Sequence, residues 1–408
     1  MPALLTAFVR NRGELLVTRR ADDSERDPGR WDGLSRPLDG SAETVASEAR
    51  RLVRSTTGLS ELRLAYAGEA VTVDGRTIHP VLFDSPNRAV GEIGGEIDGV
   101  AAVDWVPATA LLDRQTVPGL WAAYEQVAPS PTTVGADTVH GAAALSIHAL
   151  EALRDQAAVD DDWETVAATA RELRTTRPSM AVLANRINRV MSSAEQSTTA
   201  IHDRAIGEIE AALDADATAA TTAADRLSGP IATLSWSGTV KDALVELGAS
   251  VTVAEARPDR EGVDLAESLA AAGLDVTVTT DAALPALLSD REFGAVLVGA
   301  DTILPNGDIV NKVGTRALAL AADRADVPVY VVAARDKVAV DDTFHSEDGP
   351  ATAVYDGPEA ITVRNPVFDL TPGELVDGVV TENGLLDSRG ISVVAAQHRS
   401  NAEWVDGE

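Results

Sequence analysis

The chain has 408 residues, of which 45% are hydrophobic but only 4% aromatic, so its cores must be built mainly from Ala, Val, Leu and Ile. Acidic residues outnumber basic ones by 64 to 34, and the formal net charge of −30 is spread along the chain, which argues against nucleic acid or an anionic membrane as a partner. The absence of cysteine excludes disulfides, thiolate nucleophiles and thiolate metal sites.

The acidic net charge also bears on the salt concentration in which the protein works. Only three lysines occur (Lys241, Lys312 and Lys337), and this scarcity together with the acidity favours a salt-rich cytosol over an ordinary acidic protein. At about 1 M salt the Debye length is about 3 Å, so self-repulsion would be mostly screened. No apolar run reaches 18 residues and the N-terminus lacks a basic lead, so we expect no membrane span, no secretion signal and a cytoplasmic location.

Residues 1–128 are predicted to be short strands around one helix. ALLTAFVRN and GELLVTRR predict a hairpin that turns at Asn11 to Gly13. The run SAETVASEARRLVRSTTG predicts a helix capped by Ser41 and ended by Gly58. Alternating apolar residues predict further strands within 62–73, 77–85 and 101–108.

The remainder divides into three parts. Residues 129–137 are rich in Pro, Ser, Thr and Gly and predict a linker. Residues 138–228 predict a helical subdomain, broken at TTRPSM and MSSAEQ. In 229–408 short apolar strands alternate with helices, which predicts a doubly wound parallel sheet, with helices expected from Val240, Gly262, Asp281 and Lys312.

The first segment resembles the Nudix family through WDGLSRP and SAETVASEARRLVRSTTGLSE. With Gly58 at the end of the Nudix box, Glu43 and Arg51 match the pattern. The three metal-binding glutamate positions are instead occupied by Leu52, Ser55 and Thr56.

The Nudix resemblance therefore implies an α/β/α domain without its metal site, with a structural or ligand-sensing role. A Nudix hydrolase with relocated metal ligands, for which Asp39 and Glu48 lie nearby, is the alternative.

Chemistry-bearing residues follow the strand AVLVGAD, which ends at Asp301. In open α/β sheets ligands bind beyond the carboxyl ends of strands, so Asp301 is a candidate acid or base. Asn311 and Lys312 lie in NKVGT, which is expected to open the next helix and so to form an anion cradle. The alternative is that Asp301 caps a turn while Lys312 pairs with an acidic residue.

Three other positions are candidates for phosphate binding. Ser237 and Gly238 follow the strand IATLS at a helix N-terminus, where ordinary N-capping is the alternative. Arg257 follows SVTVAEA, and Arg177 in TTRPS is expected to start a helix; either guanidinium is suited to clamp a phosphate.

These pieces in this order resemble the family of translation initiation factor 2B alpha, beta and delta subunits, which includes ribose-1,5-bisphosphate isomerase and methylthioribose-1-phosphate isomerase. The matching stretches include HGAAAL, TTRPSMAVLANRINRV, TLSWSGTV, EARP, GADTILPNGDIVNKVGT and NPVFDLTPGELVDGVVTENG, within about residues 134–390. The resemblance implies a helical part followed by a Rossmann-like part, and assembly as a dimer or hexamer.

The resemblance also implies roles for single residues. In the isomerases of the family the catalytic pair is a Cys and the Asp of GAD; Asp301 is retained, whereas Ser235 stands at the Cys position. His140 and Gly141 stand where the family has an RGA motif, whose Arg is expected to contact phosphate. A serine hydroxyl is far less acidic than a thiol and needs its own base.

The sequence thus favours a protein that binds a phosphorylated sugar or nucleotide, regulatory or weakly catalytic, with no cofactor or metal. One alternative is an aldose–ketose isomerase of ribose-1-phosphate-type sugars, in which Asp301 is the acid/base, Ser235 or a water replaces the thiol, and Lys312 neutralises an oxyanion. Nudix hydrolysis is the other alternative. A translation-factor partner is implied by the resemblance alone.

Overall fold

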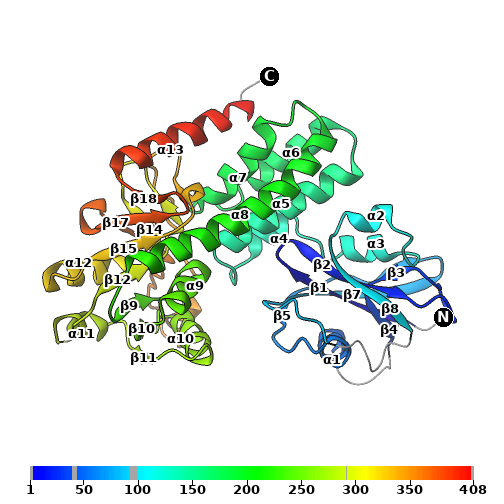
Figure 1. The fold of residues 1–408 in the computed structure, drawn as a ribbon, viewed down its shortest axis with the longest axis horizontal. Coiled ribbons are helices and arrows are strands. Elements are labelled where there is room, and N and C mark those ends of the chain that lie inside the picture. The colour runs from blue at the N-terminus through cyan, green and yellow to red at the C-terminus, as the bar shows by residue number, and fades with distance from the viewer. Residues whose placement is uncertain (1–2, 39–43, 92–98, 291, 406–408) are drawn as a thin grey trace. The chain divides into compact units, whose positions relative to one another are not determined.

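The computed structural model describes residues 3–38, 44–91, 99–290 and 292–405 (Figure 1). They form two compact units: residues 1–130 with 151–161, and residues 131–150 with 162–408. No described helix is both long and apolar enough to cross a membrane.

The N-terminal unit is built on one mixed sheet. Strand β1 (Leu4–Asn11) pairs antiparallel with β2 (Glu14–Arg20) and parallel with β7 (Arg76–Asp84), in the order β3-β2-β1-β7-β5. Arg12 and Gly13 both have positive φ, at 51° and 79°, as a two-residue hairpin turn requires. The hairpin prediction is confirmed. The other strands of this sheet are β3 (Trp31–Asp32), β4 (Leu34–Pro37), β5 (Arg63–Ala67), β6 (Val71–Val73) and β8 (Val100–Pro107).

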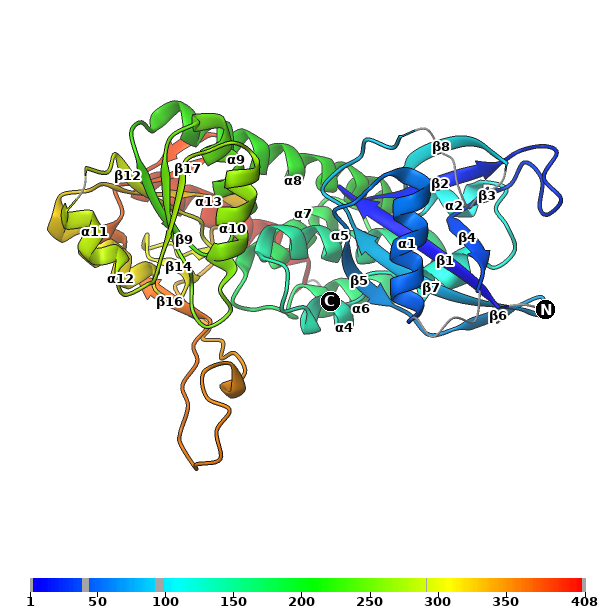
Figure 2. The same ribbon diagram turned by 90° about the horizontal axis from the view of Figure 1, so that it is seen from below.

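Helices cover both faces of this sheet (Figure 2). Because successive strand residues point to opposite faces, Leu5 and Val9 of β1 pack with helix α1 (Val45–Thr57). Phe8 packs on the other side with α2 (Ala110–Asp113) and α3 (Leu120–Glu125). The result is the three-layer α/β/α arrangement expected for this segment.

The start of α1 differs from the prediction. Thr44 is its N-cap and accepts a hydrogen bond from the Ser47 N–H at 3.2 Å, whereas Ser41 lies outside the described residues. The predicted end is confirmed, because Gly58 adopts φ 76° in the left-handed region and its N–H donates to the Arg54 carbonyl.

The second unit begins with helices. The run expected as a linker contains α4 (Pro131–Ala136), in which Pro131 occupies the first helical position and Val134 is buried. The predicted helix breaks at TTRPSM and MSSAEQ are confirmed. The other helices are α5 (Ala142–Val159), whose residues from Glu151 on belong to the N-terminal unit, α6 (Trp163–Leu173), α7 (Ala181–Ser192) and α8 (Thr198–Arg226).

A seven-stranded sheet in the order β11-β10-β9-β12-β15-β17-β18 forms the centre of this unit, and the predicted parallel pairing is confirmed for all pairs except β17 with β18. Its strands are short apolar runs, most of them buried, as expected for a sheet covered on both faces. They are β9 (Ile231–Leu234), β10 (Val251–Ala254), β11 (Val276–Thr279), β12 (Ala295–Val298), β15 (Val329–Val332), β17 (Gly378–Thr381) and β18 (Gly384–Leu386).

Helices pack on both faces of this sheet, so it is doubly wound. One core joins α8, α9 (Gly238–Leu247) and α10 (Glu261–Ala271) to the sheet. The other joins α11 (Leu284–Asp290), α12 (Thr315–Ala325) and α13 (Ser388–Asn401) to it.

A small antiparallel sheet combines two strands between β12 and α12 with one strand from beyond α12, and it corrects one prediction. It consists of β13 (Thr302–Ile303), β14 (Ile309–Lys312) and β16 (Phe368–Thr371). Lys312 is therefore the last residue of a strand paired with Phe368, and α12 starts only at Thr315. Four short 3-10 helices complete the described elements: η1 (Arg335–Lys337), η2 (Ala351–Ala353), η3 (Gly373–Leu375) and η4 (Glu403–Val405).

Candidate active site

Ser235 lies directly beyond the carboxyl end of β9 and is nearly fully buried. Its φ of 63° places a non-glycine residue in the left-handed region, a conformation that costs about 1–3 kcal/mol and is concentrated at functional sites. Its hydroxyl donates a hydrogen bond of 2.6 Å to Oε2 of Glu261. The serine that replaces the expected thiol thus has a carboxylate acceptor of its own.

Glu261 is the first residue of α10 and joins Ser235 to Lys312. Its second carboxylate oxygen, Oε1, accepts from Lys312 Nζ at 3.1 Å. The position of Glu261 is fixed by Gly262, because a Cβ there would lie 1.9 Å from the Ala254 carbonyl oxygen. Only glycine lets α10 approach the end of β10 so closely.

Asp301 comes three residues after the end of β12, and its N–H donates to the Val310 carbonyl oxygen at 2.9 Å. Burial raises the pKa of Asp301, and the cations of Lys337 and Lys312 oppose that rise. The negative charges of Glu261 and Glu347 raise it further. Asp301 and Lys312 therefore act on one another electrostatically, and Lys312 is hydrogen-bonded to the acceptor of Ser235.

Lys337 is a second cation that acts on Asp301, and it is buried. Its ammonium donates to the carbonyl oxygen of Ala300 at 2.5 Å. Burial lowers the pKa of Lys337, and the carboxylate of Asp301 counteracts this effect. Asp301 and Lys337 thus each favour the charged form of the other.

The residue before Lys337 anchors it. Burial opposes the ionisation of Asp336, but Arg186 and Arg189 outweigh it and lower the pKa of Asp336 to about 2. The guanidinium groups lie 3.1 Å and 2.6 Å from Asp336 Oδ2. Through these pairs α7 holds η1, and with it Lys337, in place.

The anion cradle expected at Lys312 is already filled by the protein. At the N-terminus of α12, the N–H groups of Gly314 and Arg316 donate to the carboxylate of Asp369 at 2.7 and 3.2 Å. Asn311 is buried and its amide donates to Thr315 Oγ1 at 2.9 Å, which fixes the same turn. The expectation was wrong because a residue 55 positions away in the chain returns to cap this helix.

Another helix N-terminus suits an anion better. Ser237 caps α9, with its Oγ accepting from the Val240 N–H at 3.4 Å, so the N-capping alternative applies to its side chain. The N–H groups of Gly238 and Thr239 lead the helix and have no acceptor within it. A Cβ on Gly238 would meet no atom within 4 Å, so space is open beside it.

The two candidate arginines differ. Arg257 is exposed, and its backbone N–H donates to Asp281 Oδ2 at 2.7 Å while its guanidinium makes no hydrogen bond to any described residue. Arg177 is buried, lies four residues before α7 rather than starting it, and is already used: it donates to Glu347 Oε1 at 2.8 Å and to the Asp137 carbonyl oxygen at 2.5 Å. The Arg257 guanidinium is available to a ligand, whereas the Arg177 guanidinium links Asp137 to Glu347 within the protein.

His140 is likewise paired within the chain. Its Nδ1 lies 2.7 Å from Oδ2 of Asp137. Gly141 is exposed just before α5, and a Cβ there would meet nothing within 4 Å.

The sequence had pointed to Asp301, Ser235 and Lys312, and the structure brings all three into one hydrogen-bonded and electrostatic group. Sequence reasoning missed Glu261, Lys337 and Glu347. The Glu-Gly pair that follows β10 could have indicated Glu261, and the rarity of lysine in this chain could have indicated Lys337.

The positions that resemble a Nudix box do not form a carboxylate cluster among the described residues. Leu52 and Thr56 are buried in the unit, and Ser55 donates to the Leu52 carbonyl. Glu48, the proposed relocated ligand, is buried and paired with Arg36 at 2.7 Å. Glu43 and Asp39 lie outside the described residues.

Comparison with known proteins identifies the second unit. The model of the initiation factor 2 subunit family matches residues 138–388. This chain belongs to that family. The family resemblance drawn from the motifs is thereby confirmed, whereas the Nudix resemblance concerns residues 1–128, which precede the matched range.

Relatives within the family carry two kinds of name. A methylthioribose-1-phosphate isomerase from Alkalilimnicola ehrlichii is 31% identical over 340 residues, covering 73% of this chain and 98% of that protein. One from Bacillus velezensis is 34% identical over 152 residues, and there the match spans only 35% of this chain and 43% of the relative. The crystal structure of the translation initiation factor eIF-2B from Pyrococcus horikoshii OT3 is similar with a TM-score of 0.56 and 27% identity, over 63% of this chain and 94% of that one.

Proposed function

We propose that this protein is an aldose–ketose isomerase acting on a 1-phosphorylated pentose of the methylthioribose-1-phosphate or ribose-1,5-bisphosphate type. The observation that carries the proposal is the group at the carboxyl ends of β9, β10 and β12: Asp301 with a raised pKa, and Ser235 and Lys312 joined through Glu261. The match to a methylthioribose-1-phosphate isomerase, which covers 98% of that protein, supports the same reaction.

The reaction sets a clear requirement for proton transfer. In a cyclic sugar 1-phosphate the bond from C1 to the ring oxygen breaks, and that oxygen gains a proton. The hydrogen on C2 moves to C1, and the C2 hydroxyl loses its proton to become a carbonyl. No atom is gained or lost overall, so the enzyme needs one group that donates a proton and one that accepts a proton.

Asp301 is suited to donating a proton, and Ser235 with Glu261 is suited to accepting one. Asp301 holds its proton more strongly than an ordinary aspartate, so in our proposal it donates to the ring oxygen. Ser235 accepts the proton of the C2 hydroxyl while passing its own to Glu261 across the 2.6 Å contact. Lys312 stabilises the oxyanion that develops at C2.

Phosphate recognition is assigned to the neighbouring loops. Space is open beside Gly238, at the helix N-terminus where the leading N–H groups of α9 lie. The exposed Arg257 guanidinium follows the adjacent strand β10 and offers a bidentate contact. Both lie at the carboxyl edge of the parallel sheet, as do Ser235 and Asp301.

Phosphorus NMR of the purified protein in molar KCl tests the proposal. With ribose-1,5-bisphosphate or methylthioribose-1-phosphate, the substrate resonance should be replaced by a new phosphate resonance over hours. The new resonance should not form with Asp301→Asn. Sharp, unchanged lines with both sugars would oppose the proposed substrate class.

A regulatory protein that binds a phosphosugar or nucleotide without turnover is the second candidate. It is favoured by the serine at position 235, since a hydroxyl is a weaker acid than a thiol, and by the similarity to an initiation factor structure. It predicts thermal stabilisation by a ligand without any product. Broadened phosphorus lines with no new resonance would support this candidate over the isomerase.

We propose further that residues 1–128 form a Nudix-like domain with a ligand-sensing or structural role, since Leu52, Ser55 and Thr56 replace the metal-binding glutamates. Magnesium-dependent release of nucleoside monophosphate and sugar phosphate from a nucleoside diphosphate sugar would contradict that role and support Nudix hydrolysis. Assembly as a dimer or hexamer, a translation-factor partner, a cytoplasmic location and adaptation to salt also remain proposals; light scattering in molar KCl tests the first.

A further inference from the structure

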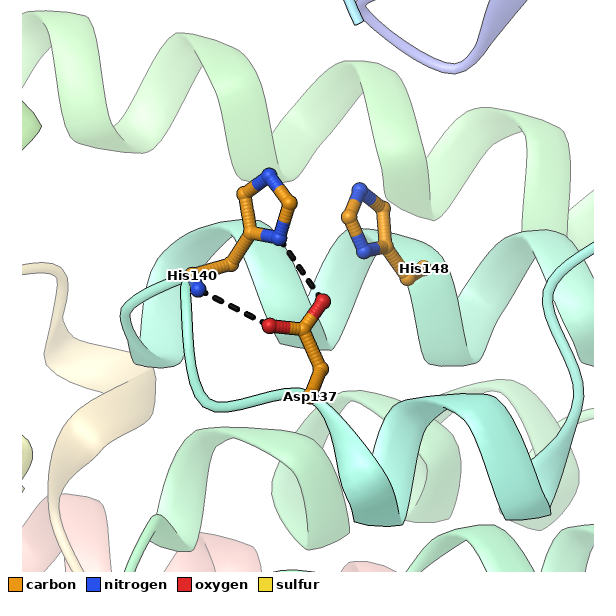
Figure 3. A group of neighbouring side chains, drawn as sticks. All are labelled: Asp137, His140 and His148. Carbon is orange, nitrogen blue, oxygen red and sulfur yellow. Dashed lines mark hydrogen bonds and ion pairs between the residues drawn. The ribbon is translucent and has the colours of Figure 1, made fainter. Parts of the chain in front are cut away.

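Two histidines and an aspartate gather where α4 meets α5. One ligand atom from each of Asp137, His140 and His148 lies within 4.8 Å of those from the other two. Among the described residues this is the one group of three or more histidine, cysteine or acidic side chains with such spacing. Figure 3 shows the two imidazole rings side by side, with the carboxylate of Asp137 beneath them.

The turn before α5 fixes two of the three side chains. Asp137 Oδ1 accepts from the backbone N–H groups of Val139 and His140 at 2.8 and 2.9 Å. Its Oδ2 lies 2.7 Å from His140 Nδ1, a contact that Figure 3 draws as a dashed line. Although burial opposes ionisation, these hydrogen bonds lower the pKa of Asp137 well below its usual range. The carboxylate is thus anionic and held in place.

The third side chain comes from the first half of α5. His148 lies on the helix that His140 precedes, and the ring centroids of the two are 5.1 Å apart at an interplanar angle of 80°. Neither imidazole therefore lies face to face on the other, and ring nitrogens of both are directed toward the same region.

We propose that Asp137, His140 and His148 bind one divalent transition-metal ion, with Zn²⁺, Co²⁺ and Ni²⁺ as the suitable class. Imidazole nitrogen and carboxylate oxygen are the ligands these ions prefer, at about 2.0–2.2 Å. In a tetrahedral site the ligand atoms are about 3.4 Å apart, so separations within 4.8 Å must close by at most about 1.4 Å through side-chain rotation. Each imidazole binds a metal ion in its neutral form.

The three protein ligands leave a coordination position for water or an oxyanion. The cluster is connected to the candidate active site through Arg177, which donates to the backbone carbonyl of Asp137 and to Glu347. The negative charge of Glu347 also raises the pKa of Asp301. Metal binding by the three ligands does not depend on the proposed isomerase activity, so the two proposals fail or stand separately.

Cobalt titration of the full-length, chelator-treated protein tests the site. One equivalent of Co²⁺ should produce visible ligand-field absorption, and stoichiometric Zn²⁺ should bleach it. His148→Ala should weaken Co²⁺ binding at least tenfold, since one of three ligands is lost. Asp137→Asn should weaken it as well, and circular dichroism melting shows whether each variant is folded.

His202→Ala is the matched control, because His202 also lies beside an aspartate, Asp203, at 3.0 Å, but outside the cluster. It should bind Co²⁺ like the wild type. The proposal is overturned if the wild-type protein binds less than about half an equivalent of both metals at 0.1 mM, or if folded His148→Ala retains wild-type affinity. If His202→Ala loses binding equally, the metal is held elsewhere and the assignment is equally wrong.

Discussion

The link between Ser235 and Lys312 depends on a single carboxylate, so Glu261→Gln is the most informative change at the candidate active site. The amide has the shape of the carboxylate and keeps an acceptor for the Ser235 hydroxyl, 2.6 Å away in the native protein. It removes only the negative charge. Ser235 then has no base, and Lys312 loses its ion-pair partner at 3.1 Å.

The expected loss of activity is large compared with the loss of stability. Removing a positioned general base typically reduces the rate about 10²–10⁴-fold, equivalent to about 3–5 kcal/mol in the activation free energy. The Glu261–Lys312 pair is partly exposed, and breaking such a pair lowers the free energy of unfolding by about 1 kcal/mol or less. A folded protein with much lower kcat is therefore expected.

The pH profile gives an independent readout of the same change. The negative charge of Glu261 raises the pKa of Asp301, so Glu261→Gln lowers that pKa relative to the wild type. If protonated Asp301 is the acid, activity falls as pH rises through its pKa. The fall should then occur at lower pH in Glu261→Gln than in the wild type.

Turnover measured by phosphorus NMR across pH, with melting temperatures in parallel, checks both effects. Glu267→Gln is the matched control, because Glu267 is an exposed glutamate on the same helix. It should leave kcat and the pH profile unchanged. A Glu261→Gln protein with kcat within threefold of wild type would refute the role of Glu261 as the base for Ser235.

Four further outcomes are expected. Asp301→Asn should abolish turnover while phosphosugar affinity, measured by calorimetry, changes by less than about tenfold; intact turnover would oppose its role as acid. Ser235→Cys should raise kcat, because a thiol with an ordinary pKa of about 8.5 gives up its proton far more readily than a hydroxyl. Asp369→Ala should lower the free energy of unfolding in urea by about 1 kcal/mol, because it removes the acceptor of the Gly314 N–H at the start of α12, and an unchanged midpoint would contradict that capping role. Since Arg186 and Arg189 lower the pKa of Asp336 to about 2, its contribution of about 2 kcal/mol is present above about pH 4 and is lost as pH falls through 2; Asp336→Asn should show a correspondingly smaller loss over that range.

The central sheet could be predicted because its information is local. The strands β9, β10 and β12 are four-residue, mainly apolar runs that are fully buried. Helices follow β9 and β10 directly, and this alternation of short apolar runs with helices indicates parallel pairing. The same reasoning placed Asp301 at the end of a strand, whereas Ser235 was singled out by the family resemblance. For Asp301 the position in the fold follows from the neighbouring sequence.

The partners of these residues could not be predicted because they depend on strand order and on distant segments. Glu261 reaches Ser235 because β9 and β10 are neighbours in the sheet. Lys312 looked helical from its own surroundings, yet pairing with Phe368 makes it part of a strand. Asp369 comes from the same distant segment and fills the helix N-terminus that had been assigned to a ligand.

Carbon NMR with a phosphosugar labelled with ¹³C at C2 tests the isomerase proposal most directly, since it observes the carbon that becomes the carbonyl. With the wild-type protein and either methylthioribose-1-phosphate or ribose-1,5-bisphosphate, the label should move from the hydroxyl-bearing region to the ketone region while the phosphate stays attached. With Asp301→Asn it should stay where it is. A wild-type protein that binds the labelled sugar, as shown by calorimetry, and leaves C2 unchanged would contradict the isomerase and favour a binding protein.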